Sequence, residues 1–166
     1  DRANPKHAAA LKEADWQANR VIDIANKEGI PPTGAVSLLR KDPENLGRRL
    51  FSTHCSSCHR YNGHDGRGFP VSEKQSAADL AGFGSVTWIA RLLDHDQYVS
   101  EKYFGGTKFK DGTMAKKALA KYDDEEKKLL PEIARLLADE AKLPYESPLE
   151  EEKREELLSL FYNDDG

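Results

Sequence analysis

The sequence predicts an all-α fold, and three observations support this. In several stretches the apolar residues recur at intervals of three and four, which places them on one face of a helix. Three of these stretches follow a residue that caps helix N-termini (Asn4, Asp42 and Ser85), and a fourth follows the acidic run 123–126. No stretch alternates apolar and polar residues as a half-buried strand does.

The N-terminal segment is predicted to be a helical arm. Asn4 and Pro5 fit the N-cap and first helical position, and Gly29 fits a C-terminal cap. The apolar stripe of this helix is expected to pack against the rest of the protein. Its members are Leu11, Ala14, Ala18, Val21, Ile22 and Ala25. Residues 30–34 are rich in proline and glycine, so residues 1–41 are predicted to form a helical arm and a Pro-rich linker.

The central segment begins with a second cap-and-proline pair, Asp42 and Pro43. Irregular loops are expected over residues 61–77 and 103–112, with a helix between them that Ser85 caps. The acidic run 123–126 suits the N-terminus of a final core helix, because the helix dipole favours negative charge there. Pro131 is expected to kink or split that helix.

The C-terminal segment, residues 143–166, is predicted to be an amphipathic extension. Ser147 and Glu150 have the spacing of a capping box. The apolar residues that follow are Leu157, Leu158, Phe161 and Tyr162. The alternative is that this segment is the first helix of a further domain of the same kind as residues 42–142.

The composition limits what the chain can do. Its 166 residues suit one domain of ordinary size with extensions, and 33% charged residues suit a small core under a charged surface. The net charge of −4 argues against nucleic acid as a partner. No run approaches the roughly 18 apolar residues of a membrane span, and no secretory leader opens the chain.

The most informative motif contains the two cysteines of the chain. Cys55 and Cys58 are separated by two residues, and His59 follows at once. C-x-x-C-H is the attachment signature of a c-type haem, in which both thiols add to vinyl groups of one porphyrin. The adjacent imidazole then serves as the proximal iron ligand. The sequence therefore predicts one covalently bound haem c held by Cys55, Cys58 and His59.

Three other interpretations of the cysteine pair are weaker. A thioredoxin-like dithiol would need a preceding strand, whereas a helix is predicted before Cys55. A zinc site would need two more ligands, and the chain has no second cysteine pair. A structural disulfide joins cysteines at this spacing only poorly.

Met114 is the candidate for the sixth iron ligand. It is the only methionine, lies in a polar loop before the final core helix, and offers a thioether that raises the reduction potential of haem iron. The alternative is that a lone methionine fills a gap in the core. His64 and His95 are the competing ligands, whereas His7 and His54 are expected to be surface or packing residues.

The stretch from about Pro43 to Lys142 resembles the class I cytochrome c family. The order of features matches: Gly47 and Phe51 in the entry helix, then the C-x-x-C-H motif, then Met114 before the last helix. The resemblance implies a mono-haem cytochrome c domain over residues 42–142. It also implies that Gly47 and Phe51 pack against the last helix, on a face that contains Leu130, Ile133 and Leu137.

The resemblance further implies a backbone partner for the proximal histidine. The family usually has a Pro-Asn-Leu step whose proline carbonyl accepts a hydrogen bond from the imidazole. This chain has Ala78-Asp79-Leu80 instead. Ala78 would then provide the carbonyl, with Pro70 as the alternative.

A closer resemblance covers nearly the whole chain. Several segments are similar to the cytochrome c domain fused behind the membrane cytochrome b in some bacterial bc-type complexes. These segments are 29–32, 42–43, 59–66, 82–84 and 103–109. The resemblance implies a tethered electron carrier whose partners are subunits of a bc-type complex and a downstream oxidase or soluble carrier.

The implied location is the periplasm or the outer face of the cytoplasmic membrane. Thioether attachment of haem normally takes place outside the cytoplasm, and the chain begins with Asp1 rather than Met. We therefore expect a mature product or fragment, with a leader or membrane anchor upstream of Asp1.

The function expected from these features is electron transfer rather than enzymatic catalysis. Two fixed axial ligands, His59 and Met114, would leave no open site for substrate. The alternative is a haem-based ligand sensor or a peroxidase-like domain, either of which needs a displaceable sixth ligand.

Overall fold

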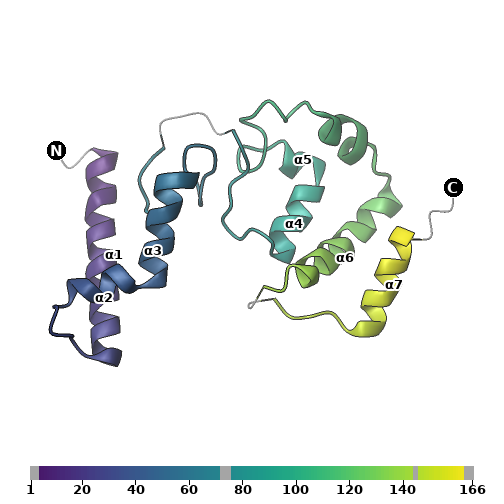
Figure 1. Cartoon of the computed structure of the whole chain (residues 1–166). Coiled ribbons are helices and arrows are strands. Elements are labelled where there is room, and N and C mark those ends of the chain that lie inside the picture. The colour runs from purple at the N-terminus through teal and green to yellow at the C-terminus, as the bar shows by residue number, and fades with distance from the viewer. Residues whose placement is uncertain (1–3, 72–75, 144–145, 163–166) are drawn as a thin grey trace. The chain divides into compact units, whose positions relative to one another are not determined.

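The computed structural model describes residues 4–71, 76–143 and 146–162. The chain forms two compact units, Asp1–Leu80 and Ala81–Gly166, and each is described by itself. All regular elements among the described residues are helices, with only isolated bridges between Tyr61, His64, Asp65 and Pro70, so the all-α prediction is confirmed (Figure 1). The unit boundary falls inside the cytochrome domain predicted for residues 42–142, and those predicted bounds remain a prediction.

Among its described residues, the first unit contains three α-helices: α1 (Pro5–Glu28), α2 (Val36–Lys41) and α3 (Pro43–Leu50). The caps lie where the sequence places them. The side chain of Asn4 accepts a hydrogen bond from the backbone of Lys6, and that of Asp42 accepts one from Asn45. Helix α2, which was not predicted, lies within the part of the chain expected to be linker.

Helix α1 packs through a different face from the one its apolar stripe predicts. Leu11 and Ile22 are each 55% exposed, whereas Glu13 is buried together with Ala9. The predicted packing stripe is therefore wrong at those two positions. A carboxylate occurs on the packed face because arginines from elsewhere in the unit neutralise it, as described below.

Asp42 joins α1 to α3. Its carboxylate caps α3 and accepts two hydrogen bonds from Arg20 of α1, at 2.6 and 3.0 Å. The Arg20 guanidinium holds the pKa of Asp42 below its ordinary value, although burial acts in the opposite direction. The start of the entry helix is therefore fixed to the arm by a charge-assisted contact.

The second unit contains α4 (Val86–Leu93), α5 (His95–Tyr98), α6 (Asp124–Glu140) and α7 (Glu151–Tyr162). Ser85 caps α4 as predicted, through a hydrogen bond from the backbone of Trp88 at 3.2 Å. Asp123 and Glu126 form a capping box at the start of α6. Helix α4 packs mainly against α6, and Tyr103, which is fully buried, donates its hydroxyl hydrogen bond to the Trp88 carbonyl.

Two details of the C-terminal half differ from the prediction. Helix α6 runs through Pro131 as one element, so of the two predicted outcomes the split is wrong and the kink stays a prediction. Pro131 is exposed, which lets the carbonyl that loses its amide partner face water. Helix α7 begins at Glu151, so the predicted capping-box start at Ser147 is also wrong.

Helix α7 is held against α6. Leu157 is 1% exposed, Lys153 pairs with Glu132 at 3.2 Å, and Arg154 pairs with Asp139 at 3.4 Å and with Glu140. Two of the apolar residues expected on this extension are Phe161 and Tyr162, and their side chains lie outside the part of the chain that the structure describes. No helix among the described residues is long and apolar enough to cross a membrane.

Candidate haem-attachment site

The C-x-x-C-H motif lies on a tight turn at the end of α3. The helix continues into a π-helical turn, Phe51–Cys55, which ends in a hydrogen bond from the Ser56 amide to the Phe51 carbonyl at 3.0 Å. The amides of Cys58 and His59 then both donate to the Cys55 carbonyl, at 3.1 and 2.9 Å. Single π turns of this kind occur frequently at functional sites.

This turn brings both thiols and the imidazole together. Cys55 is partly buried, Cys58 is exposed, and neither cysteine is in a disulfide. His59 is partly buried, and its Nδ1 lies 2.7 Å from the Ala78 carbonyl oxygen. A carbonyl oxygen can only accept, so Nδ1 carries the proton and Nε2 keeps its lone pair. This contact confirms Ala78, rather than Pro70, as the backbone partner of the histidine.

The segment that carries Ala78 lies along the motif and the loop after it. The amides of Ser76 and Ala77 donate to the Cys58 carbonyl at 3.3 and 3.2 Å, and the Leu80 amide donates to the Arg60 carbonyl at 2.8 Å. Between these contacts lies Asp79, which is 4% exposed. Sequence reasoning assigned no role to the Asp79 side chain.

Asp79 binds the tip of a small hairpin. Asn62 and Gly63 both have positive φ, 54° and 81°, which fits a type I′ turn built on an Asn-Gly pair. The Asp79 carboxylate accepts hydrogen bonds from both turn amides, at 2.9 Å from Asn62 and 2.7 Å from Gly63. An Asn-Gly pair in a predicted loop was the sequence signal for this turn.

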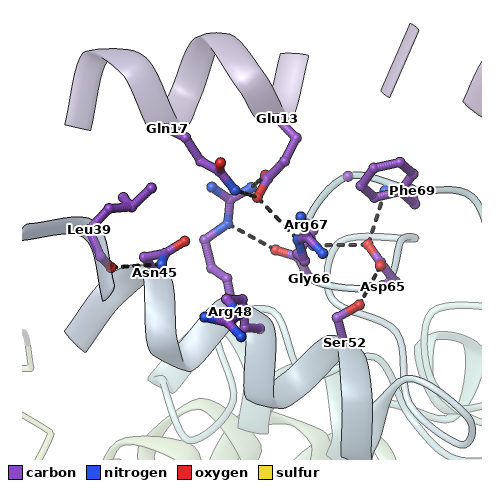
Figure 2. Close-up of polar contacts among 12 residues, drawn as sticks. Glu13, Gln17, Leu39, Asn45, Arg48, Ser52, Asp65, Gly66, Arg67 and Phe69 are labelled. Atoms are coloured by element: carbon purple, nitrogen blue, oxygen red, sulfur yellow. Dashed lines mark hydrogen bonds and ion pairs between the residues drawn. The ribbon is translucent and has the colours of Figure 1, made fainter. Parts of the chain in front are cut away.

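The loop after the hairpin is fixed to the π turn by Asp65 (Figure 2). The Asp65 carboxylate accepts hydrogen bonds from the Ser52 hydroxyl at 2.6 Å and from the amides of Arg67 and Phe69 at 2.9 Å each. Burial acts to raise the pKa of Asp65, but these hydrogen bonds outweigh it, so the pKa lies below its ordinary value. Gly66 follows, and a Cβ there would lie 2.8 Å from the Phe51 ring.

The arm helix contacts the same loop through an ion-pair cluster of Glu13, Arg48 and Arg67 (Figure 2). Glu13 accepts from Arg48 at 2.8 Å and from Arg67 at 3.1 Å. Arg48 also donates to the Gly66 carbonyl at 3.1 Å, and its guanidinium lies 3.7 Å from the centre of the Trp16 ring. Helix α1 is therefore part of the frame that supports the loop after the motif.

The competing histidines have other partners. The Nδ1 atom of His64 accepts hydrogen bonds from the amides of Gly66 and Gly68, at 3.0 and 3.2 Å. The proton of the neutral ring is therefore on Nε2, which leaves that nitrogen without a lone pair for a metal. His95 lies on the short helix α5 with its Nδ1 3.2 Å from an Asp96 carboxylate oxygen.

The structure brings Cys55, Cys58 and His59 together in the first unit, whereas Met114 lies in the second unit. It is the first residue of a π-helical turn, Met114–Ala118, which a 3₁₀ turn, Leu119–Lys121, follows. Ala115 and Leu119 are 1% and 2% exposed and pack beside Tyr98, whereas Met114 is 40% exposed. Met114 therefore lies exposed on an anchored turn and does not fill the core of its unit.

The residues present fit a covalent haem. Two thiols separated by two residues can form both thioethers, and an adjacent imidazole with its Nδ1 proton occupied has Nε2 available for iron. The all-α fold and this motif define the class, a small helical haem protein. The cytochrome c family model matches residues 45–131, a little more than half of the chain, and the chain belongs to that family.

The family assignment establishes the general properties of the protein. Its cofactor is covalent haem c with iron, its fold is that of an all-α cytochrome c, and its function is haem-based electron transfer with redox partners. Searches of curated proteins and of solved structures gave no match.

Proposed function

We propose that this protein transfers electrons through one haem c that Cys55 and Cys58 attach and that His59 and Met114 ligate. The observation that carries the proposal is the 2.7 Å hydrogen bond between His59 and Ala78, on the same turn as two cysteines that form no disulfide. It fixes both the tautomer and the direction of the imidazole, as second-shell partners of metal-bound histidines do. The bound haem supplies the one-electron chemistry, and the protein holds the iron and shields it from water.

The outward position of Met114 supports its role as the sixth ligand. Met114 is 40% exposed at the start of a turn whose backbone Ala115 and Leu119 anchor, so its side chain is not committed to the core of its unit. Among the candidates, it is also the only ligand type that raises the potential, which suits an electron carrier. The polar partners of His64 and His95 agree with this choice.

A haem sensor or peroxidase-like domain is the alternative function, and one spectrum distinguishes it from a carrier. We expect the full holoprotein to cycle reversibly between ferric and ferrous forms, and its reduced spectrum to stay unchanged under carbon monoxide. A sixth ligand that is fixed blocks the diatomic gas, whereas a displaceable one lets it bind. A reduced spectrum that shifts fully on addition of carbon monoxide would favour the sensor or peroxidase.

We also propose that residues 42–142 are the cytochrome domain of a tethered carrier that works with the subunits of a bc-type complex. The arm, residues 1–41, would connect the domain to a membrane part, and residues 143–166 would be its extension. The segment resemblances support this proposal. The periplasm or the outer face of the cytoplasmic membrane suits a protein with covalent haem c. A downstream oxidase or soluble carrier would accept the electron.

A lysine-rich surface next to Met114 supports an acidic redox partner. It consists of Lys108, Lys110, Lys116, Lys117 and Lys121, and all five side chains are exposed. Lys116 pairs with Asp111 at 3.8 Å, and both of these groups are well exposed to solvent. Such a pair contributes little, so the surface keeps its positive charge for steering a partner.

Charge reversal tests this surface. We expect Lys116→Glu with Lys117→Glu to slow reduction of the holoprotein by a detergent-solubilised bc-type complex, by roughly tenfold at low salt, with the difference shrinking as salt screens the charges. Stopped-flow haem absorbance measures the rate. A matched control is Lys127→Glu with Lys128→Glu on α6. Equal rates for wild type and the Lys116/Lys117 variant at low salt would contradict the docking surface.

A further inference from the structure

The hydrogen bond of His59 depends on where the Ala78 carbonyl lies, and that carbonyl belongs to a segment without regular secondary structure. Three backbone contacts hold the segment. The amides of Ser76 and Ala77 bind the Cys58 carbonyl on one side of Ala78, and the Leu80 amide binds the Arg60 carbonyl on the other. These contacts are made by main-chain atoms, so a change of side chain does not remove them directly.

Asp79 adds a side-chain contact at the next residue. Its carboxylate oxygens bind separate donors, the amides of Asn62 and Gly63, at 2.9 and 2.7 Å. Hydrogen bonds to an ionised acceptor are roughly twice as strong as neutral ones. The side chain is almost fully buried, so water does not compete readily for these donors.

The geometry points to Asp79 as a positioning residue that fixes the Ala78 carbonyl against His59 Nδ1 and thereby lowers the reduction potential of the haem. This inference rests on the proposed role of His59 as proximal ligand. A hydrogen bond from Nδ1–H to an acceptor makes the imidazole a stronger electron donor, which favours ferric iron. Weakening that bond raises the potential.

The hairpin that Asp79 binds is itself held in place. The Tyr61 amide donates to the His64 carbonyl at 2.8 Å, and the His64 amide donates back at 3.3 Å. The two turn amides that Asp79 binds lie between these paired residues, so the hairpin itself sets their positions. Asp79 therefore connects Ala78 to a fixed point rather than to a mobile loop.

The test compares Asp79→Asn with Asp65→Asn in the full holoprotein. Asparagine at position 79 keeps one acceptor oxygen, but its amide NH₂ would face the second turn amide. We expect the His59 Nδ1 proton to exchange with solvent roughly tenfold faster or more, because a charge-assisted hydrogen bond is lost. Nitrogen-15 NMR of the ferrous protein measures this exchange. The midpoint potential should rise in the same variant.

Asp65→Asn is the matched control. It also removes a partly buried carboxylate that accepts backbone amides, in the same unit, but one that does not bind the Ala78 segment. It should lower thermal stability while leaving the His59 proton exchange and the midpoint potential near the wild-type values. Equal changes in both variants would overturn the inference, because loss of charge or of general stability would then explain them.

A second variant, Asp79→Glu, covers the case in which Asp79→Asn does not fold. Glutamate keeps the charge but displaces it by one methylene, so its exchange rate and potential should lie between those of wild type and Asp79→Asn. Wild-type values of the exchange rate and the potential in folded Asp79→Glu holoprotein would overturn the inference alone, whether or not Asp79→Asn folds. Absence of porphyrin ring-current shifts on the His59 ring of wild type would overturn the proposed ligation, and the inference with it.

Discussion

Replacing both cysteines, as Cys55→Ser with Cys58→Ser, is expected to abolish covalent haem completely. A serine hydroxyl does not add to the porphyrin vinyl groups, and no other cysteine exists in the chain to replace either thiol. The mass of the wild-type chain, expressed with a secretory leader and haem-attachment machinery, should exceed that of the polypeptide by one haem. The mass of the double variant should equal that of the polypeptide alone.

Ser57→Ala is the control for this experiment. Ser57 lies between the cysteines and is exposed, with only a 3.8 Å contact from its hydroxyl to the Cys58 sulfur. It should keep covalent haem at the wild-type level. Haem that stays bound to the double variant through acid–acetone extraction would contradict attachment by these cysteines.

Met114→Ala is expected to have the second largest effect, because it removes the proposed sixth ligand. The weak red absorption band of Met-ligated ferric haem should disappear, and the reduced protein should gain the ability to bind carbon monoxide. The midpoint potential should fall by roughly 0.2 V, a quarter of the ~0.8 V over which axial ligands set haem potentials. Optical redox titration measures this change.

Lys117→Ala, three residues along the same turn, is the control and should retain the wild-type spectrum and nearly the wild-type potential. The competing ligands give the opposite pattern. An unchanged spectrum in Met114→Ala, together with a changed spectrum in His64→Ala or His95→Ala, would show a bis-histidine haem and contradict the proposal.

Local signals predicted three helix starts correctly, and in each of them the cap is made by residues close in sequence. Asn4, Asp42 and Ser85 each accept a hydrogen bond from an amide two or three residues on, so residue type and spacing are enough to identify them. The same holds for the turn at Cys55, whose hydrogen bonds span three or four residues.

Predictions failed where a distant part of the chain decides the outcome. The sequence pattern of α1 favoured burial of Leu11 and Ile22, but the packed face carries Glu13, because Arg48 and Arg67 reach it from 35 and 54 residues away. The start of α7 moved from Ser147 to Glu151, where its ion pairs and Leu157 meet α6. No window of local sequence contains these partners.

The sequence by itself determined the cofactor, because thioether attachment needs only two thiols and an imidazole at fixed spacing on one turn. The resemblance to the cytochrome c family limited the backbone partner of His59 to Ala78 or Pro70. Only the tertiary structure decided between them, and it showed that Asp79 and the Asn62–Gly63 turn support the chosen carbonyl. The physical reason is the separation along the sequence. His59 and Ala78 are 19 residues apart, so their hydrogen bond depends on the path of the whole intervening loop.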